Sequence, residues 1–506
     1  MKRFYSLVSS IIVLAFIFTL IPIKADASQT STMRLSGADR YETAVAISQE
    51  GFSQADTVLL ARGDDFPDAL AATPLAHQLN GPILLTKPKS LSPSTKDELL
   101  RLNTKKVVIL GGTGAVSAEV EASLSNLGLE VERISGKTRF ETAEQIAQQL
   151  GGTEKAILAY GYNYPDALAI ASYAAKNGYP ILLTDKNKLP ASTKSLLASK
   201  QEVILVGGTG AISQEVYNQI PVAKSRISGK NRFETATKIL DTLNLSDKSI
   251  FIANGWGFPD ALTGSVLAAK MDASLLLTNG DSPTPETLQA LSSGNTDQLV
   301  FLGGSAALSA DVVTDLQEET NSSFFREAFI QAEQYFYETL DYSASFESQR
   351  DLFTSHFTES FTDTVIQPYY EESYATDWFL FGNGDIIDYY SRYAIKESSD
   401  NKVVFRTIQA GTDMIWPGYI DITFVRVGDS WLIDDLSLIY DNIDFNFSKT
   451  EATHYLEYYY GENTVTFVAE GHFDHYGEQV FSYKFKVNDG SGEQIVYFDP
   501  ESAYFW

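Results

Sequence analysis

Six arginines recur in pairs along this 506-residue chain, six residues apart within each pair. A guanidinium group presents several N–H donors in one plane, which suits bidentate pairing with a carboxylate or a phosphate. The pairs therefore indicate binding of an anionic ligand. They are Arg34 and Arg40, Arg133 and Arg139, and Arg226 and Arg232.

The same arginines have an internal alternative, because carboxylates recur with them. An aspartate follows each pair by roughly thirty residues, and a glutamate lies two residues after the second arginine. Ion pairs within the protein would use the same donors, so the sequence leaves both interpretations open. The carboxylates are Asp68, Asp166 and Asp260, and Glu42, Glu141 and Glu234.

Each arginine pair opens one copy of a repeat. Four blocks return three times in constant order, namely R-[LI]-S-G-x-x-R-[YF]-E-T-A, [FY]-P-D-A-L, P-I-L-L-T and L-G-G-T-G-A-[VI]-S. The third copy departs from the last two, with Ser274 in place of the proline and Ala306 in place of the third glycine. A period of about 95 residues suits a small globular domain. We expect repeats at 33–131, 132–224 and 225–320.

The pattern inside one repeat predicts alternating strands and helices. Residues 57–61, 82–86 and 106–110 are short runs of mainly apolar residues without polar alternation, which is typical of strands covered on both faces in a parallel sheet. Helical spacing follows Gly37, and Pro67 suits the first turn of a further helix towards Leu79. The predicted fold class is α/β, with three tandem Rossmann-like parallel-sheet modules and an α+β C-terminal region.

The glycine turn that follows residues 107–110 has three interpretations. It is a structural turn, a contact for an anionic ligand through free N–H groups at a helix N-terminus, or a nucleotide site. The nucleotide interpretation is the weakest, since the turn has neither the G-x-G-x-x-G spacing nor a P-loop lysine.

The first residues predict export. Lys2 and Arg3 precede an apolar stretch, and residues 25–27 read Ala-Asp-Ala, so we expect a signal peptide at 1–27. An uncleaved membrane anchor is the alternative. The chain has no cysteine, which excludes disulfides, cysteine catalysis and a lipid-modified cysteine. No C-terminal sorting motif is visible, so any attachment to a surface is expected to be non-covalent.

The four blocks resemble the type 2 cell-wall-binding repeat of exported Gram-positive proteins, over about residues 33–320. The resemblance implies three modules around a pseudo-threefold axis that bind an anionic secondary wall polymer, without a cofactor, at sites between modules. It places two further segments, with the arginines, near those sites and leaves the third copy in doubt. The segments are Pro82, Ile83, Leu84 and Leu85, and Pro180, Ile181, Leu182 and Leu183. We expect a secreted protein at the cell wall, bound multivalently.

The C-terminal region has a different composition. Residues 321–506 hold 32 acidic and 10 basic residues, and the whole chain has a net charge of −27, so nucleic acid is not an expected partner. We expect an α+β domain at 323–446, with a helix at 324–342, and a small α+β unit at 448–506. The first resembles the nuclear-transport-factor-like cone fold, which hosts enzymes and inert binding modules alike.

The function of that region stays open between three alternatives. We expect a binding or interaction domain with an unknown ligand; the others are a peptidoglycan hydrolase formed by 323–506 and a surface sensor or adhesin. No catalytic residue and no metal site is assigned. His472 and His475 are the nearest approach to a metal cluster, and they are expected in a polar turn.

Overall fold

The computed structural model describes residues 30–506 except 293–295, 342, 373–392, 400, 410–417, 429, 440–444, 446, 448, 461–463, 476, 489–491, 504 and 506. The predicted signal peptide lies outside the described residues. The chain divides between Asn321 and Ser322 into two compact units. We call residues 30–321 the repeat unit and residues 322–506 the C-terminal unit. No described helix is long and apolar enough to cross a membrane.

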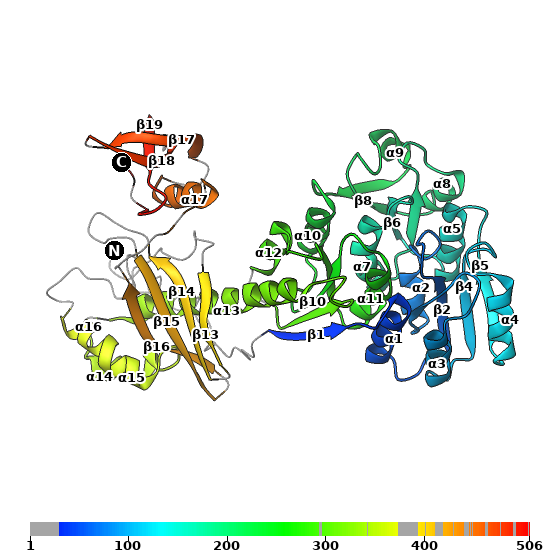
Figure 1. The fold of residues 1–506 in the computed structure, drawn as a ribbon, viewed down its shortest axis with the longest axis horizontal. Coiled ribbons are helices and arrows are strands. Elements are labelled where there is room, and N and C mark those ends of the chain that lie inside the picture. The colour runs from blue at the N-terminus through cyan, green and yellow to red at the C-terminus, as the bar shows by residue number, and fades with distance from the viewer. Residues whose placement is uncertain are drawn as a thin grey trace, which may run out of the picture. The chain divides into compact units, whose positions relative to one another are not determined.

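The described part of the repeat unit contains three parallel sheets of four strands (Figure 1). The first has the order β3 (Ile83–Thr86), β2 (Thr57–Arg62), β4 (Lys106–Leu110), β5 (Glu130–Ile134). The second has the order β7 (Ile181–Thr184), β6 (Lys155–Tyr160), β8 (Glu202–Val206), β9 (Ala223–Ile227). The third has the order β11 (Ser274–Thr278), β10 (Ser249–Asn254), β12 (Gln298–Leu302), β1 (Ser31–Leu35). The parallel α/β architecture is confirmed.

The fourth strand of every sheet comes from a different repeat than the other three. β5 opens the second repeat and pairs with β4, and β9 opens the third and pairs with β8. β1 opens the first repeat and pairs with β12 of the third, from Ser31 opposite Gln298 to Leu35 opposite Leu302. The exchange is therefore cyclic. The expected repeat boundaries after residues 131 and 224 fall inside β5 and β9, because the head of each repeat completes the preceding sheet.

Helices cover both faces of the sheets. On one side lie the helices of the repeat heads and those that follow the third block, namely α1 (Arg40–Gly51), α3 (Pro93–Arg101), α5 (Arg139–Leu150), α8 (Ala191–Leu197), α10 (Arg232–Thr242) and α12 (Pro285–Leu291). In the middle of the unit α2 (Thr73–Gln78), α7 (Ala171–Lys176) and α11 (Pro259–Lys270) contact one another. α4 (Ala118–Asn126), α6 (Pro165–Ala169) and α9 (Gln214–Gln219) complete the set.

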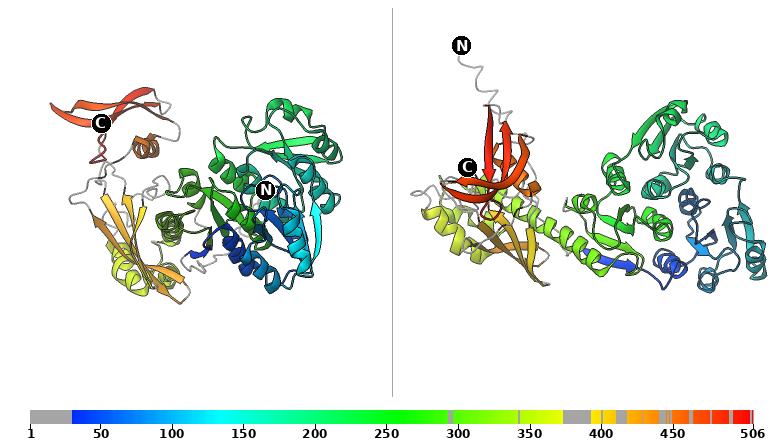
Figure 2. Two further views of the ribbon diagram at one scale, coloured as in Figure 1. Left: turned by 45° about the vertical axis from the view of Figure 1, so that its right-hand side comes forward. Right: turned by 45° about the horizontal axis from the view of Figure 1, so that its top comes forward.

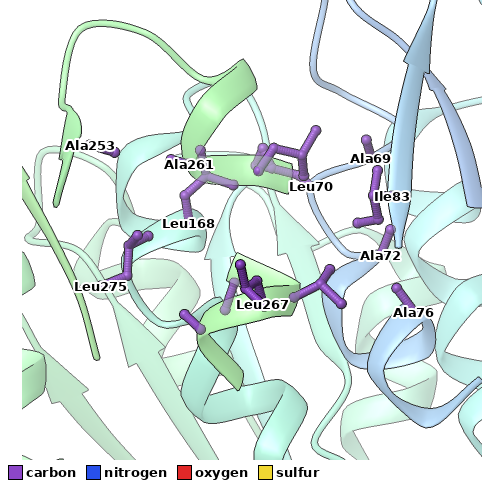
Figure 3. Close-up of a cluster of buried hydrophobic side chains, with 14 of the residues drawn as sticks. Ala69, Leu70, Ala72, Ala76, Ile83, Leu168, Ala253, Ala261, Leu267 and Leu275 are labelled. Atoms are coloured by element: carbon purple, nitrogen blue, oxygen red, sulfur yellow. The ribbon is translucent and has the colours of Figure 1, made fainter. Parts of the chain in front are cut away.

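Apolar side chains from all three repeats meet between these central helices. Leu70, Leu168 and Leu267 lie in one buried cluster, each exposing at most 2% of its surface (Figure 3). Burying a leucine side chain contributes about 1.5–3 kcal/mol, so this cluster joins the repeats strongly. One local prediction is wrong. Pro67 lies in a turn and α2 begins only at Thr73, whereas Pro165 and Pro259 do begin helices.

The C-terminal unit contains two antiparallel sheets. α13 (Ala310–Thr339) includes the point of division between the units, and α14 (Phe346–Phe353), α15 (Glu359–Phe361), the π-helical segment η1 (Thr362–Ile366) and α16 (Gln367–Glu372) follow it. The first sheet is β13 (Tyr393–Ser398), β14 (Lys402–Gln409), β15 (Gly418–Val427) and β16 (Ser430–Ile439). A second core gathers around buried phenylalanines, Phe336 and Phe405 among them.

The second sheet follows α17 (Lys449–Tyr460) and consists of β17 (Val465–His475), β18 (Glu478–Asn488) and β19 (Glu493–Phe498) (Figure 2). It has its own small core around Phe485 and Phe498. His472 and His475 lie in strand β17, so the prediction of a polar turn there is wrong; Gly477, just before β18, lies in a turn. The resemblance of 323–446 to the cone fold stays a prediction.

Candidate functional site

The first arginine of each pair lies in a head strand and binds the glycine turn of the neighbouring strand. Arg34 donates to the carbonyl of Gly303 at 3.0 Å, Arg133 to Gly111 at 2.8 Å, and Arg226 to Gly207 at 2.6 Å. All three arginines are half-buried. These side chains therefore fasten the exchanged strand to the end of the sheet that it completes.

The second contact of these arginines differs from copy to copy. Arg133 forms an ion pair with Glu121 at 2.6 Å, whereas Arg226 lies over the ring of Tyr217, with 5.4 Å between its Cζ and the ring centroid. Arg34 instead donates to the carbonyl of Leu308 at 3.0 Å. Within the described residues none of these three arginines pairs with the recurring carboxylates. Each gives at least one donor to a backbone carbonyl, and Nη2 of Arg226 is buried without a hydrogen-bond partner.

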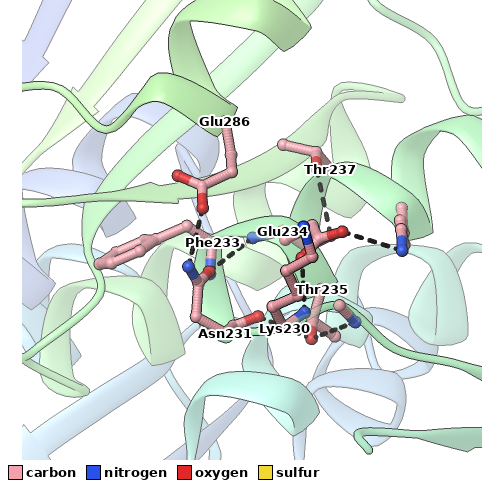
Figure 4. Close-up of polar contacts among 9 residues, drawn as sticks. Lys230, Asn231, Phe233, Glu234, Thr235, Thr237 and Glu286 are labelled. Atoms are coloured by element: carbon pink, nitrogen blue, oxygen red, sulfur yellow. Dashed lines mark hydrogen bonds and ion pairs between the residues drawn. The ribbon is translucent and has the colours of Figure 1, made fainter. Parts of the chain in front are cut away.

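The rest of the head motif caps the helix that follows. In the third repeat Asn231 accepts from the backbone N–H groups of Phe233 and Glu234, both at 2.9 Å, and its amide donates to Glu286 (Figure 4). Glu234 in turn accepts from the N–H of Lys230 at 2.5 Å. This reciprocal cap satisfies backbone donors that a helix N-terminus leaves free. The recurring glutamates are therefore structural residues, which explains why they follow the arginine at fixed spacing.

The second arginine of each pair stands in the first turn of a head helix. Arg40, Arg139 and Arg232, which we call the junction arginines, donate to the carbonyls of Gly63, Gly161 and Gly255 at 2.7–2.8 Å. Those glycines directly follow β2, β6 and β10, so the guanidinium groups lie at the carboxyl ends of the central strands. Arg40 is exposed and the other two are half-exposed. In open α/β sheets this edge is where ligands bind.

Two junction arginines, Arg232 and Arg40, also interact electrostatically with an aspartate of the preceding repeat. Burial raises the pKa of Asp166 above its ordinary value, and the positive charge of Arg232 opposes that rise. Burial likewise raises the pKa of Asp260, against the charge of Arg40. Asp68 accepts a hydrogen bond from Thr142 of the second repeat at 2.8 Å. The three aspartates thus mark three junctions between successive repeats, the last of which closes the ring.

Three aromatic rings meet between the junctions. The centroids of Phe66 and Tyr164 are 5.3 Å apart, those of Phe66 and Phe258 5.6 Å, and those of Tyr164 and Phe258 6.0 Å. Each ring belongs to the [FY]-P-D-A-L block of a different repeat. Mutual contact of three equivalent residues identifies the pseudo-threefold axis, and the junction arginines are arranged around it.

The sequence pattern did not identify one further position, the residue that follows each glycine bound by a junction arginine. It is Asp64 in the first repeat, Tyr162 in the second and Trp256 in the third. Tyr162 is 49% exposed and Trp256 is 61% exposed. The position varies in type, so a search for recurring residues passes over it; two aromatic residues after the same glycine were the available signal.

The two P-I-L-L segments are buried. Pro82, Ile83, Leu84 and Leu85 lie at the start of β3 and within it, and Pro180, Ile181, Leu182 and Leu183 occupy the same place at β7. Leu84 and Leu182 expose none of their surface. The side chains of these segments pack inside the sheet, and their place near a polymer site stays a prediction. Ser274 takes the place of the proline in the third repeat without loss of the strand, and donates to the carbonyl of Ser246 at 2.6 Å.

The glycine turn is not at a helix N-terminus. α4 begins at Ala118, several residues after Gly111, and the carbonyl of Gly111 is taken by Arg133. The N–H of Gly111 donates to the carbonyl of Ile134 at 2.8 Å. Of the three interpretations, the structural turn is the one that this geometry supports.

One pocket of about 560 Å³ lies between α10 and α12. Its lining includes the carboxylates of Glu234, Asp241, Asp247 and Glu286, with the ammonium group of Lys238. An anionic ligand would be repelled by this lining at short range, so the pocket does not suit the ligand that the arginines indicate.

The described residues of the C-terminal unit offer little that is typical of a catalytic site. No group of three or more metal-ligating side chains occurs among the residues that the structure describes. His356 is buried, stacks on Tyr335 with 4.3 Å between centroids, and has its pKa lowered by burial to about 4. It is therefore a neutral core histidine at physiological pH.

The three repeats match a known protein family. The profile of cell wall binding domain 2 (CWB2) matches residues 34–121, 133–217 and 226–313, more than half of the chain. N-acetylmuramoyl-L-alanine amidase LytC of Bacillus subtilis is 39% identical over 309 residues, which is 61% of this chain and 62% of the amidase. The amidase enhancer of the same organism is 38% identical over 290 residues, 57% of this chain and 40% of the enhancer.

Two solved structures share the fold of the repeat region. Cwp6 from Clostridium difficile is 30% identical with a TM-score of 0.55, covering 58% of this chain and 50% of Cwp6. Cwp8 from the same organism is 33% identical with a TM-score of 0.54, covering 58% of this chain and 53% of Cwp8. The chain thus spans less than two thirds of the length of each of these relatives.

Proposed function

The chain belongs to the family of proteins with cell wall binding domain 2, and from that premise we propose that it is an exported protein whose repeat unit binds an anionic wall polymer. Family membership gives the chain a wall-binding role and a place at the cell wall or surface. Two statements of the proposal go beyond family membership: the polymer is anionic, and the protein is exported. In this proposal the C-terminal unit is displayed at the wall for an interaction of its own.

One observation supports an anionic polymer as the ligand. Three guanidinium groups, each from a different repeat, stand at the carboxyl ends of the central strands around one pseudo-threefold axis. Each donates one hydrogen bond to a glycine carbonyl, and a guanidinium has five N–H donors. Donors therefore remain for phosphate or carboxylate groups, and three equivalent junctions on one rigid body suit a repeating chain.

The overall negative charge does not oppose this proposal. Salt screens charge–charge interaction beyond about 8 Å at physiological ionic strength. Most of the acidic excess belongs to residues 321–506 and not to the repeat unit. Weak contacts at several junctions add up, since binding at one raises the effective concentration at the next.

Co-sedimentation of the full chain with purified Gram-positive cell walls tests the proposal. We expect the protein to pellet with untreated walls and to stay in solution with walls whose anionic polymer has been extracted with acid. Pelleting with both would show that the ligand is not the anionic polymer, and pelleting with neither would reject the wall-binding proposal. Release of soluble peptidoglycan fragments in the same samples would favour the hydrolase alternative.

A further inference from the structure

We propose that Trp256 and Tyr162, each resting on its junction arginine, are platforms on which sugar rings of the wall polymer stack, and that the first repeat has no such platform. This inference rests on the proposed function and names the residues through which the second and third repeats bind carbohydrate. It makes the three copies unequal, although they share one fold.

Trp256 is exposed and yet held in place. Its backbone N–H donates to Asn254 at 2.9 Å and its indole Nε1 donates to Asn279 at 2.5 Å. The Cζ atom of Arg232 lies 3.9 Å from the centroid of the indole, and the edge of Phe233 packs at 6.0 Å. A ring fixed in this way loses little conformational entropy when a ligand binds to it.

Tyr162 has the same surroundings in the second repeat. The Cζ atom of Arg139 lies 4.5 Å from its ring centroid, and Phe140 and Tyr160 contact it at 5.7 and 5.8 Å. The residue before it, Gly161, supplies the carbonyl that orients the arginine. Both aromatic side chains therefore share two equivalent neighbours, the junction arginine and the phenylalanine that follows it.

The combination of ring and guanidinium defines the ligand chemistry. The face of an aromatic ring carries negative electrostatic potential, which attracts the C–H groups on the apolar face of a sugar as it attracts cations. The adjoining guanidinium donates hydrogen bonds to a charged oxygen. A sugar ring that bears a phosphate or carboxylate group satisfies both at once.

The first repeat replaces the platform with a carboxylate. Asp64 occupies the position and forms an ion pair with Arg62 at 2.7 Å, and that hydrogen bond lowers the pKa of Asp64 below its ordinary value. Asp65 adds a second negative charge beside it. Arg40 therefore has acidic neighbours where the other junction arginines have rings.

The test compares wall binding of full-chain variants over a range of protein concentrations. We expect Trp256→Ala and Tyr162→Ala each to raise the half-saturating concentration by about fivefold to tenfold, and the double variant to raise it further. Trp256→Phe keeps a ring and is expected to stay within about twofold of the wild type. Phe481→Ala is the matched control, because it removes a 42% exposed ring from the C-terminal unit.

A second readout does not depend on the stability of the alanine variants. Trp256 is the one tryptophan of the repeat unit. Polymer extracted from the same walls is expected to change the emission of the wild type and to leave that of Trp256→Phe unchanged. Asp64→Tyr, which installs a ring at the first junction, is expected to lower the half-saturating concentration.

The two proposals fail in different ways. Wild-type protein that does not pellet with untreated walls rejects the proposed function. Wild-type protein that pellets, while Trp256→Ala and Tyr162→Ala bind as tightly as Phe481→Ala, overturns the platforms and leaves wall binding intact. Emission that does not respond to saturating polymer likewise overturns the role of Trp256.

Discussion

Three glycines show how closely single residues are fitted at the junctions. Gly111, Gly207 and Gly303 follow the last strand of each repeat and have φ values of +91°, +107° and +101°. A Cβ atom at each would lie 2.4–2.5 Å from an Oδ2 atom of the junction aspartate. Glycine is therefore required for two reasons: the backbone is left-handed at these positions, and a carboxylate approaches closely.

Gly207→Ala is expected to destabilise the repeat unit by about 2–4 kcal/mol, as the sum of backbone strain and displacement of Asp166. Urea unfolding followed by circular dichroism measures the change. Gly210→Ala in the same turn is the control, since its Cβ would meet nothing within 4 Å. Equal stability of the two variants would contradict the fit described here.

The two arginines of a pair have different roles, although they recur with equal regularity. The first lies in a strand and is occupied by the turn carbonyl, whereas the second lies at a helix start and keeps donors towards solvent. Spacing alone does not distinguish them, because the first binds a glycine carbonyl of the preceding repeat and the second binds one of its own repeat, as Arg133 and Arg139 show.

At the scale of elements, the exchanged head strands hold the repeats in a closed ring. β1 is the strand that closes it, through parallel pairing with β12 along five residues. Without β1, the N–H and C=O groups at that edge of β12 have no partner strand, and the third sheet is left with three strands.

Deletion of residues 30–36 is expected to open this edge. Amide hydrogen exchange of Gln298–Leu302 in β12 should accelerate by at least tenfold, since its protecting hydrogen bonds are lost. Lys106–Leu110 in β4 provides the internal control, because its partner β5 stays in place. Equal acceleration at β4 would mean that the deletion unfolds the whole repeat unit, and unchanged exchange at β12 would show that β1 does not protect it.

At the scale of the whole molecule, the chain has separate cores on either side of residue 321. The core of the repeat unit includes Phe251, and the main core of the C-terminal unit includes Phe405, both fully buried. The repeat unit and the acidic, aromatic region thus depend on different sets of packing contacts. Each unit is expected to unfold cooperatively by itself.

Scanning calorimetry of the full chain is accordingly expected to resolve two transitions. Phe251→Ala should lower the midpoint of one by an amount equivalent to about 3–5 kcal/mol, and Phe405→Ala should lower the other, because each creates a cavity in one core. Each variant serves as the control for the other. A single transition that both substitutions shift would show that the units unfold together.

The sequence by itself determined the triplication, the parallel α/β class, the place of the compositional boundary and the arginine pairs. Each of these depends on local information, since apolar strands, helix caps and recurring blocks are visible within a few residues.

Tertiary structure decided the rest. Only the folded chain shows that β1, β5 and β9 complete the sheet of another repeat, that the P-I-L-L segments are buried, and that Asp166 faces Arg232. These facts join residues that are far apart in sequence, because parallel pairing and ring closure leave no local signal at either partner. Likewise, only the folded chain shows that the exposed rings of Tyr162 and Trp256 lie against Arg139 and Arg232.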